Sequence, residues 1–119
     1  MAKKSMVIIA SSDNPEEAYK AFIMGTTGGG MDVDVTMFFT MSGLNIIKKE
    51  GVEKINIPGA PPLQDLLSQA KEMGVHLVAC SLAMKVLGVK DEDLIEGVKP
   101  VGAATALDHA LSADLTLSF

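Results

Sequence analysis

Short apolar runs of the strand type alternate with helix-type segments along the whole chain. The strand-type runs fall at residues 5–12, 33–40, 75–80, 98–102 and 114–119. Helix-type segments lie between them, at residues 14–27, 62–74, 81–88 and 103–113. Parallel strands need a long connection between them, and that connection is usually a helix. The alternation therefore predicts an α/β sandwich with a mainly parallel sheet of about five strands.

Helix start and stop signals divide the first half of the chain. Asn14 and Pro15 have the types preferred at an N-cap and at the first helical position. The glycines at residues 28–30 are expected to end the helix that begins there. Residues 42–51 predict a second, short helix, and residues 52–62 predict a loop.

The composition is that of an ordinary globular protein. Of the 119 residues, 48% are hydrophobic and 21% are charged, so we expect a single domain with one core over residues 1–119. The net charge is −5, and the chain has four Phe and one Tyr. Without a basic patch or many rings to stack on bases, we expect no nucleic-acid partner.

The apolar runs do not predict export or membrane insertion. The first run ends at Ala10, which is too early for the roughly 7–15 apolar residues of a signal peptide. The longest apolar region, residues 75–89, is interrupted by His76 and Lys85. A single cysteine cannot form an internal disulfide, which fits a reducing compartment. We expect a cytoplasmic chain without a membrane span.

The GTTGGG run at residues 25–30 invites comparison with phosphate-binding loops. Such loops place glycines after a strand and before a helix, so that helix amides face the anion. Here the glycines follow a helix-type segment and precede a strand-type run. This order favours helix termination and close packing.

Metal-binding motifs are absent from the sequence. His76 and His109 are the only histidines, and neither has a cysteine or histidine partner at ligand spacing. His76 precedes Cys80 by four residues on one expected strand, which separates them by roughly 13 Å. That is too far for a shared metal or a thiolate–imidazole pair. We expect no metal and no organic cofactor.

Cys80 lies where the strand-type run 75–80 passes into the helix-type segment 81–88. Ligands of open α/β sheets bind beyond the carboxyl ends of the strands. The dipole and free amides at a helix N-terminus also favour a thiolate, which is the nucleophilic form of cysteine. Free cysteine is equally a common, inert core residue. The residues alone leave both interpretations open.

Other strand ends would supply the neighbours of this thiol. Ser11 and Ser12 follow the first expected strand, and Thr40 and Met41 follow the second. Their hydroxyl groups would donate hydrogen bonds to a thiolate, while Met41 and Met84 would line an apolar, polarisable pocket. The alternatives are turn hydrogen bonding for the serines and core packing for the methionines.

Several stretches together carry a family resemblance. They are MVIIASS at residues 6–12, the run at 18–49 that contains TMFFT, LVACSLAMKVLGV at 77–89, DEDLIEGV at 91–98 and the ending VGAATALDHALSADLTLSF. In order and spacing they resemble the DsrE/DsrF-like family of small sulfur-handling proteins. The resemblance implies a three-layer α/β/α fold, homo-oligomers (trimers or hexamers) and a relay of sulfane sulfur in the cytoplasm.

The resemblance also implies a role for Cys80, because the family's cysteine at this position carries sulfur as a persulfide. Ser81 and Met84 match the surrounding motif, and we place both near the substrate without assigning them a chemical role. Longer members of this branch carry an insertion after the second strand and often a second cysteine. This chain has neither, so a relay between two cysteines of one chain is impossible.

Three functions remain open at this point. The leading one is a sulfur carrier or sulfurtransferase that takes sulfur from a donor protein or a small sulfane-sulfur compound and passes it to a partner thiol. The second is a non-catalytic oligomeric subunit, a scaffold of a sulfur-related complex, in which Cys80 is a buried bystander. The third is a peroxiredoxin-like thiol redox protein, which would need an external resolving thiol.

Overall fold

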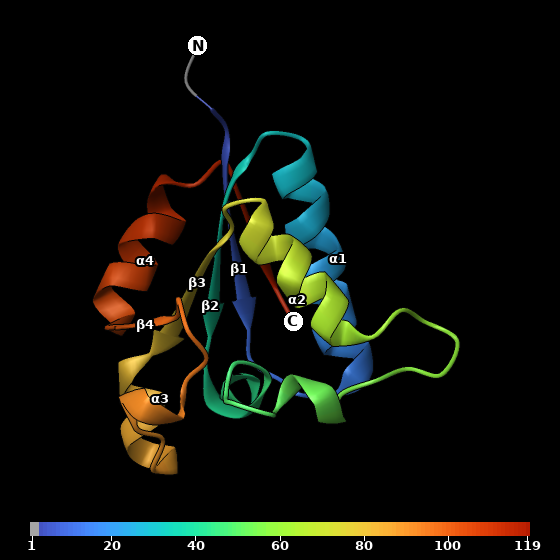
Figure 1. The fold of residues 1–119 in the computed structure, drawn as a ribbon. Helices are drawn as coiled ribbons and strands as arrows, with labels where there is room; N and C mark the ends of the chain where they lie inside the picture. The colour runs from blue at the N-terminus through green and yellow to red at the C-terminus, as the bar shows by residue number, and fades with distance from the viewer. Residues whose placement is uncertain (1–2) are drawn as a thin grey trace.

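A five-stranded parallel sheet forms the centre of the molecule over residues 3–119, which the computed structural model describes (Figure 1). The strands lie in the order β4-β3-β2-β1-β5. All four pairings between neighbours are parallel. Their bounds are β1 (Ser5–Ala10), β2 (Asp34–Phe39), β3 (His76–Cys80), β4 (Lys99–Val101) and β5 (Leu115–Ser118). The predicted α/β architecture is confirmed.

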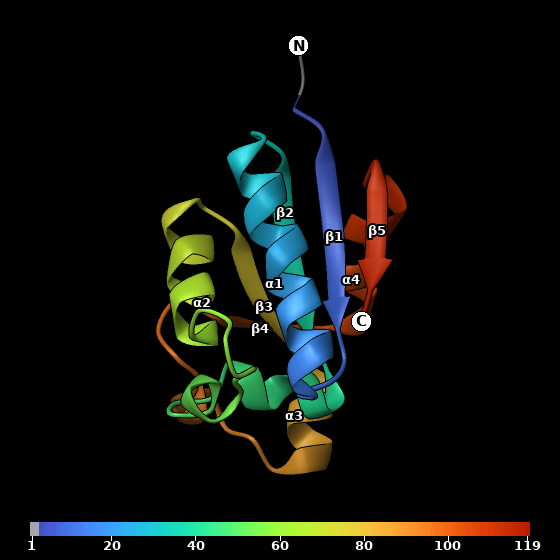
Figure 2. The same cartoon turned by 90° about the vertical axis from the view of Figure 1, so that its right-hand side faces the viewer.

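Helices cover both faces of this sheet. On one face, α1 (Pro15–Gly30) and α2 (Leu63–Glu72) lie side by side, and α4 (Ala103–Ser112) lies on the other (Figure 1 and Figure 2). The short helix α3 (Ser81–Leu87) lies beyond the carboxyl end of β3. These are the three layers that the family resemblance implies. Among residues 3–119, no helix has the length and apolar character needed to cross a bilayer.

Both the start and the end of α1 match their sequence signals. The Asn14 side chain accepts a hydrogen bond from the Glu16 amide at 3.0 Å, as expected of an N-cap. The helix continues through Gly28 and Gly29 and ends at Gly30, the last of the glycines that were expected to end it. A Cβ at Gly28 would come within 2.6 Å of Met6 Cε. Glycine here lets the helix lie close to the sheet, despite its low helix propensity.

Two short 3₁₀ helices, η1 (Met41–Ile46) and η2 (Val52–Lys54), replace the expected helix and loop after β2. A third, η3 (Asp91–Asp93), lies later in the chain, between α3 and β4. In η1, Gly43 packs directly on the carbonyl group of Ala10, where any Cβ would overlap the oxygen. This contact holds η1 across the carboxyl edge of the sheet, where it packs against β3 and α3.

The side chain of Tyr19 in α1 forms hydrogen bonds with the loop between η2 and α2. The Tyr19 hydroxyl donates a hydrogen bond to the Pro61 carbonyl at 2.8 Å, and it accepts one from the Ile57 amide at 3.4 Å. The tyrosine is only 5% exposed. The proline-containing loop is therefore anchored to the helix layer.

The two sheet faces differ in packing. On the face that α1 and α2 cover, which we call the closed face, Phe22 of α1 packs on Phe39 of β2 with ring centroids 5.9 Å apart. Both rings are fully buried. On the opposite face, which we call the open face, none of residues 103–112 in α4 is buried. Leu107 and Leu111 are 61% and 78% exposed.

Candidate functional site

Cys80 ends β3 and forms the N-cap of α3. Its Sγ accepts a hydrogen bond from the Ala83 amide at 3.5 Å. The helix that follows ends at Gly88, whose φ of 70° lies in the left-handed region where glycine carries no Cβ penalty. The cysteine is 7% exposed. It is thus mostly buried, and its sulfur lies at a helix N-terminus on the carboxyl edge of the sheet, where the sequence predicts it.

Strand register places Thr40 beside Cys80. The β2–β3 pairing runs to Phe39 opposite Ala79, and one further step aligns Thr40 with Cys80, at the roughly 5 Å spacing of neighbouring strands. Thr40 is extended, with φ −138° and ψ 159°, so the alternation of side chains continues through it. On the other side, Val101 of β4 is the register partner of Cys80.

Met41, the next residue, has a backbone conformation that is uncommon for a residue with a side chain. Its φ is 48°, in the left-handed region that costs an L-residue roughly 1–2 kcal/mol. Its side chain is 47% exposed. The strained residue begins η1, which packs against both β3 and α3. Strain of this kind persists where the surrounding structure enforces it, and it is often found next to functional groups.

The structure does not bring Ser11 and Ser12 to the thiol. The Ser11 hydroxyl donates to the Phe119 carbonyl at 2.9 Å, and the Ser12 hydroxyl accepts from the Asn14 amide at 3.0 Å. Both follow β1, which β2 separates from β3, a distance of roughly 10 Å. Their observed hydrogen bonds are those of a turn and a chain end.

The residues of α3 contribute differently to this edge. Ser81, the first helical residue, is half-buried, and Met84 is 4% exposed within the core. Leu82, Val86 and Leu87 are 63%, 66% and 49% exposed. An apolar rim therefore lies on the helix that Cys80 caps. The imidazole of His76 is at the other end of β3, 3.2 Å from an Asp34 oxygen.

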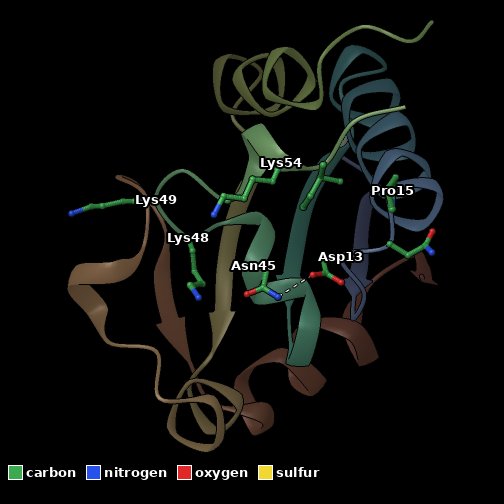
Figure 3. A pocket seen from close by; sticks show the side chains of 9 residues that line it. Asp13, Pro15, Asn45, Lys48, Lys49 and Lys54 are labelled. Carbon is green, nitrogen blue, oxygen red and sulfur yellow. Dashed lines mark hydrogen bonds between the residues drawn. The ribbon is translucent and has the colours of Figure 1, made fainter. Parts of the chain in front are cut away.

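A hollow on the same edge of the sheet was not predicted from the sequence. It has a volume of about 460 Å³ and lies between the β1–α1 loop and the segment from η1 to η2 (Figure 3). Lys48, Lys49 and Lys54 line it, together with Asp13 and residues near them. Three lysines within seven residues are visible in the sequence, but nothing there indicates that they share a hollow.

Comparison with known proteins assigns the chain to a family. The sequence model described as the DsrE/DsrF-like family matches residues 3–119. The chain belongs to this family. The resemblance seen in the sequence is confirmed over nearly the whole length.

Similar proteins fall into two groups by extent of coverage. The sulfur carrier protein DsrE2 of Allochromatium vinosum is 23% identical, with 98% of this chain and 99% of that protein covered. MJ0989 of Methanocaldococcus jannaschii is 32% identical over 82% of each chain. MJ0760 of the same organism is 30% identical over 81% of this chain, which spans only 35% of that protein's length. The DsrE2 alignment extends over 157 positions, so that relative carries inserted segments that this 119-residue chain lacks.

Solved structures share the fold at low sequence identity. The ychN protein of E. coli superposes with a TM-score of 0.77 and 19% identity, covering 98% of this chain and 99% of that one. MTH1491 of Methanobacterium thermoautotrophicum gives a TM-score of 0.74 and 18% identity, with 98% and 100% covered. These neighbours support the same arrangement of a parallel sheet between helices.

Proposed function

We propose that this chain is a sulfur carrier, or sulfurtransferase, that holds sulfane sulfur as a persulfide on Cys80. The single observation that carries the proposal is the place of Cys80, which caps a helix at the carboxyl edge of a parallel sheet. The family match and the relative named a sulfur carrier support it. A solitary thiol in a reducing compartment suits this task, and we propose a cytoplasmic location.

The proposed transfer needs two displacement steps. The Cys80 thiolate attacks the terminal sulfur of a donor persulfide; the donor S–S bond breaks, and the donor leaves as a thiolate. The Cys80 persulfide then loses its outer sulfur to the thiolate of an acceptor, which regenerates the Cys80 thiolate. One sulfur atom moves in each step without net oxidation, so neither a metal nor an organic cofactor is required.

The surroundings of Cys80 suit these steps. The Ala83 amide donates to Sγ, and a donor aimed at sulfur stabilises negative charge there. In this proposal the hydroxyl of the neighbouring Thr40 donates to the attacking or departing sulfur. Met41 and Met84 supply polarisable contacts around it. Ser81 lies at the helix start beside the thiol, while Ser11 binds the chain end at Phe119 and Ser12 stabilises the β1–α1 turn.

The exposed apolar side chains support self-association, which we propose gives a trimer or hexamer. Leu82 and Val86 on α3 and Leu107 and Leu111 on α4 are each more than half exposed. Exposed apolar side chains gathered on a surface are typical of interaction sites. Light scattering of the purified chain measures the molar mass and tests the assembly, and a monomer at micromolar concentration would contradict it.

Intact mass spectrometry tests the sulfur-carrier proposal directly. The protein is incubated with polysulfide or thiosulfate, desalted and weighed, with Cys80→Ser as the matched control. We expect the native chain to gain the mass of one sulfur atom, dithiothreitol to remove it, and the variant to gain none.

Other outcomes point to the two alternative functions. If no donor produces an adduct and Cys80 resists alkylation in the folded state, the non-catalytic subunit is the better interpretation, which the burial of Cys80 favours. Consumption of hydrogen peroxide with added thiol, without a sulfur adduct, would favour the redox function. Either result overturns the sulfur-carrier proposal.

A further inference from the structure

The hollow beside α1 combines opposite charges with an apolar wall. Its lining comes from three places, the β1–α1 loop, η1 and the following segment: Asp13, Asn14, Pro15, Asn45, Lys48, Lys49, Gly51, Lys54 and Ile55. In Figure 3, Lys48 and Lys54 lie on one side of Asn45, and Asp13 lies on the other. Lys49 extends away from both lysines in the same view. Cys80 does not line this hollow.

The lysine side of the hollow carries positive charge that the protein leaves unneutralised. Within residues 3–119, the lysine–carboxylate ion pairs engage Lys3 and Lys20, so Lys48 and Lys54 have no carboxylate partner there. The chain as a whole has a net charge of −5. Two free ammonium groups facing one hollow in an acidic protein attract an anion more strongly than isolated surface lysines do.

The segment that carries the lysines is held in place by backbone contacts with residues 93–95 and within itself. The Lys49 amide donates to the Asp93 carbonyl, and the Ile95 amide donates to the Ile47 carbonyl, each at 2.9 Å. Gly51 packs directly on the backbone carbonyl of Asn45. Because the backbone is fixed before any ligand arrives, less ordering entropy is lost on binding.

The opposite side of the hollow presents hydrogen-bond acceptors. The Asn45 side-chain amide donates to Asp13 Oδ2 at 3.0 Å, which fixes the carboxylate and leaves acceptor capacity on both side chains. Ile55, which is 7% exposed, and Pro15 add apolar surface. A simple anion would be attracted by the lysines but repelled by Asp13. The ligand that fits both sides is negative at one end and carries hydrogen-bond donors at the other.

We infer that this hollow is a binding site for a small phosphorylated polyol, such as a sugar phosphate. The phosphate lies against Lys48 and Lys54, since lysine binds phosphate well as a point charge. The hydroxyl groups donate to Asp13 and Asn45. The volume of about 460 Å³ is within the range of small-molecule sites, roughly 300–1,000 Å³. The site is separate from the proposed sulfur chemistry.

Calorimetric titration with D-ribose 5-phosphate tests this site, with D-ribose and inorganic phosphate as comparison ligands. The titrated protein carries Cys80→Ser, so that the outcome does not depend on the thiol. We expect ribose 5-phosphate to bind at least several-fold more tightly than phosphate, and ribose not to bind. Equal affinity for phosphate and ribose 5-phosphate, or no heat with either at millimolar concentration, would overturn the inference.

Paired variants locate the site. Lys48→Gln with Lys54→Gln should weaken ribose 5-phosphate about tenfold or more, because two charge-assisted hydrogen bonds are lost. Lys71→Gln with Lys99→Gln removes the same charge from exposed positions outside the hollow and should leave affinity unchanged. If both double variants weaken binding equally, the attraction is only that of net charge, and the site is refuted.

Asp13→Asn distinguishes the proposed ligand from any anion. Loss of the carboxylate removes an acceptor for the ligand hydroxyls, so ribose 5-phosphate should bind several-fold more weakly. The same variant should bind inorganic phosphate more tightly, because a repulsive charge is gone. Tighter binding of both ligands would contradict the role given to Asp13.

Discussion

The closed and open faces of the sheet hide their apolar side chains to very different extents. On the closed face, α1 buries seven of its residues between Ala18 and Gly28. On the open face, α4 buries none of its residues 103–112, and Leu107 and Leu111 face solvent. On the closed face, the apolar core is covered by helices of the same chain, whereas the open face leaves apolar side chains that a partner would cover. We therefore expect the closed face to provide most of the stability of the fold and the open face to provide the surface for association.

Strand alternation places the thiol with the open face. Val78 and His76 line cavities on the side of α4, and alternate residues of a strand share a face. Cys80 follows Val78 by two positions, so it belongs to the same side. The proposed chemistry and the proposed association would then share one face, while the closed face only supports it.

The largest effect is expected from Phe22→Ala on the closed face. Phe22 is fully buried and packs on Phe39, so the truncation removes apolar burial and leaves a cavity. We expect a loss of about 3–5 kcal/mol in the free energy of unfolding, measured by urea denaturation. A loss below about 1 kcal/mol would mean that the closed face does not carry the stability.

A pair of glycine substitutions probes the fit of α1 to the sheet. At Gly28 a Cβ would meet Met6 Cε at 2.6 Å and Val35 Cγ2 at 3.0 Å, whereas at Gly30 it would meet nothing within 4 Å. We expect Gly28→Ala to cost about 1–3 kcal/mol by overpacking. Gly30→Ala should be neutral or stabilise by up to about 1 kcal/mol. Thermal unfolding of both variants checks the contrast, which equal shifts would disprove.

The smallest effect on the fold is expected from Leu111→Asp on the open face. The side chain is 78% exposed, so far-UV circular dichroism should not change, and the unfolding free energy of the monomer should stay within about 0.5 kcal/mol. The molar mass from light scattering should fall, because a charge enters the apolar surface. Ser112→Asp adds the same charge at the adjacent exposed position and should leave the mass unchanged. If the native chain and both variants have the same molar mass, Leu111 is not part of an interface.

The fold followed from the sequence wherever a local signal and the packing agreed. Asn14 and Pro15 begin α1 as expected, and Gly88 ends α3 in a left-handed conformation. The glycines at 28–30 end α1 as expected, and Gly28 in addition lets the helix lie close to Met6, a tertiary contact that the sequence does not show. η1 was expected as an ordinary helix, because its close contact with the Ala10 carbonyl is likewise not visible in its own residues.

The two sites differ in how far the sequence could predict them. The position of Cys80 at a strand end and helix start follows from local pattern alone, and the structure shows the same arrangement. Thr40 lies beside it because β2 and β3 are paired in register, whereas Ser11 follows β1, which is one strand further away from β3. The lysine hollow depends on a turn at Glu50, where φ is 66°. No local sequence signal predicts a left-handed backbone conformation at this glutamate.

The anchoring of the loop to α1 by Tyr19 provides an optical signal. Tyr19 is the only tyrosine, and the chain has no tryptophan, so ultraviolet emission of the native protein comes essentially from this ring. Its hydroxyl forms hydrogen bonds with Ile57 and Pro61. Ile57 follows Ile55, which lines the lysine hollow, by two positions, and Pro61 lies just before α2. Unlabelled fluorescence therefore reports on the docking of this loop. Its response to ligands can be followed without introducing a dye.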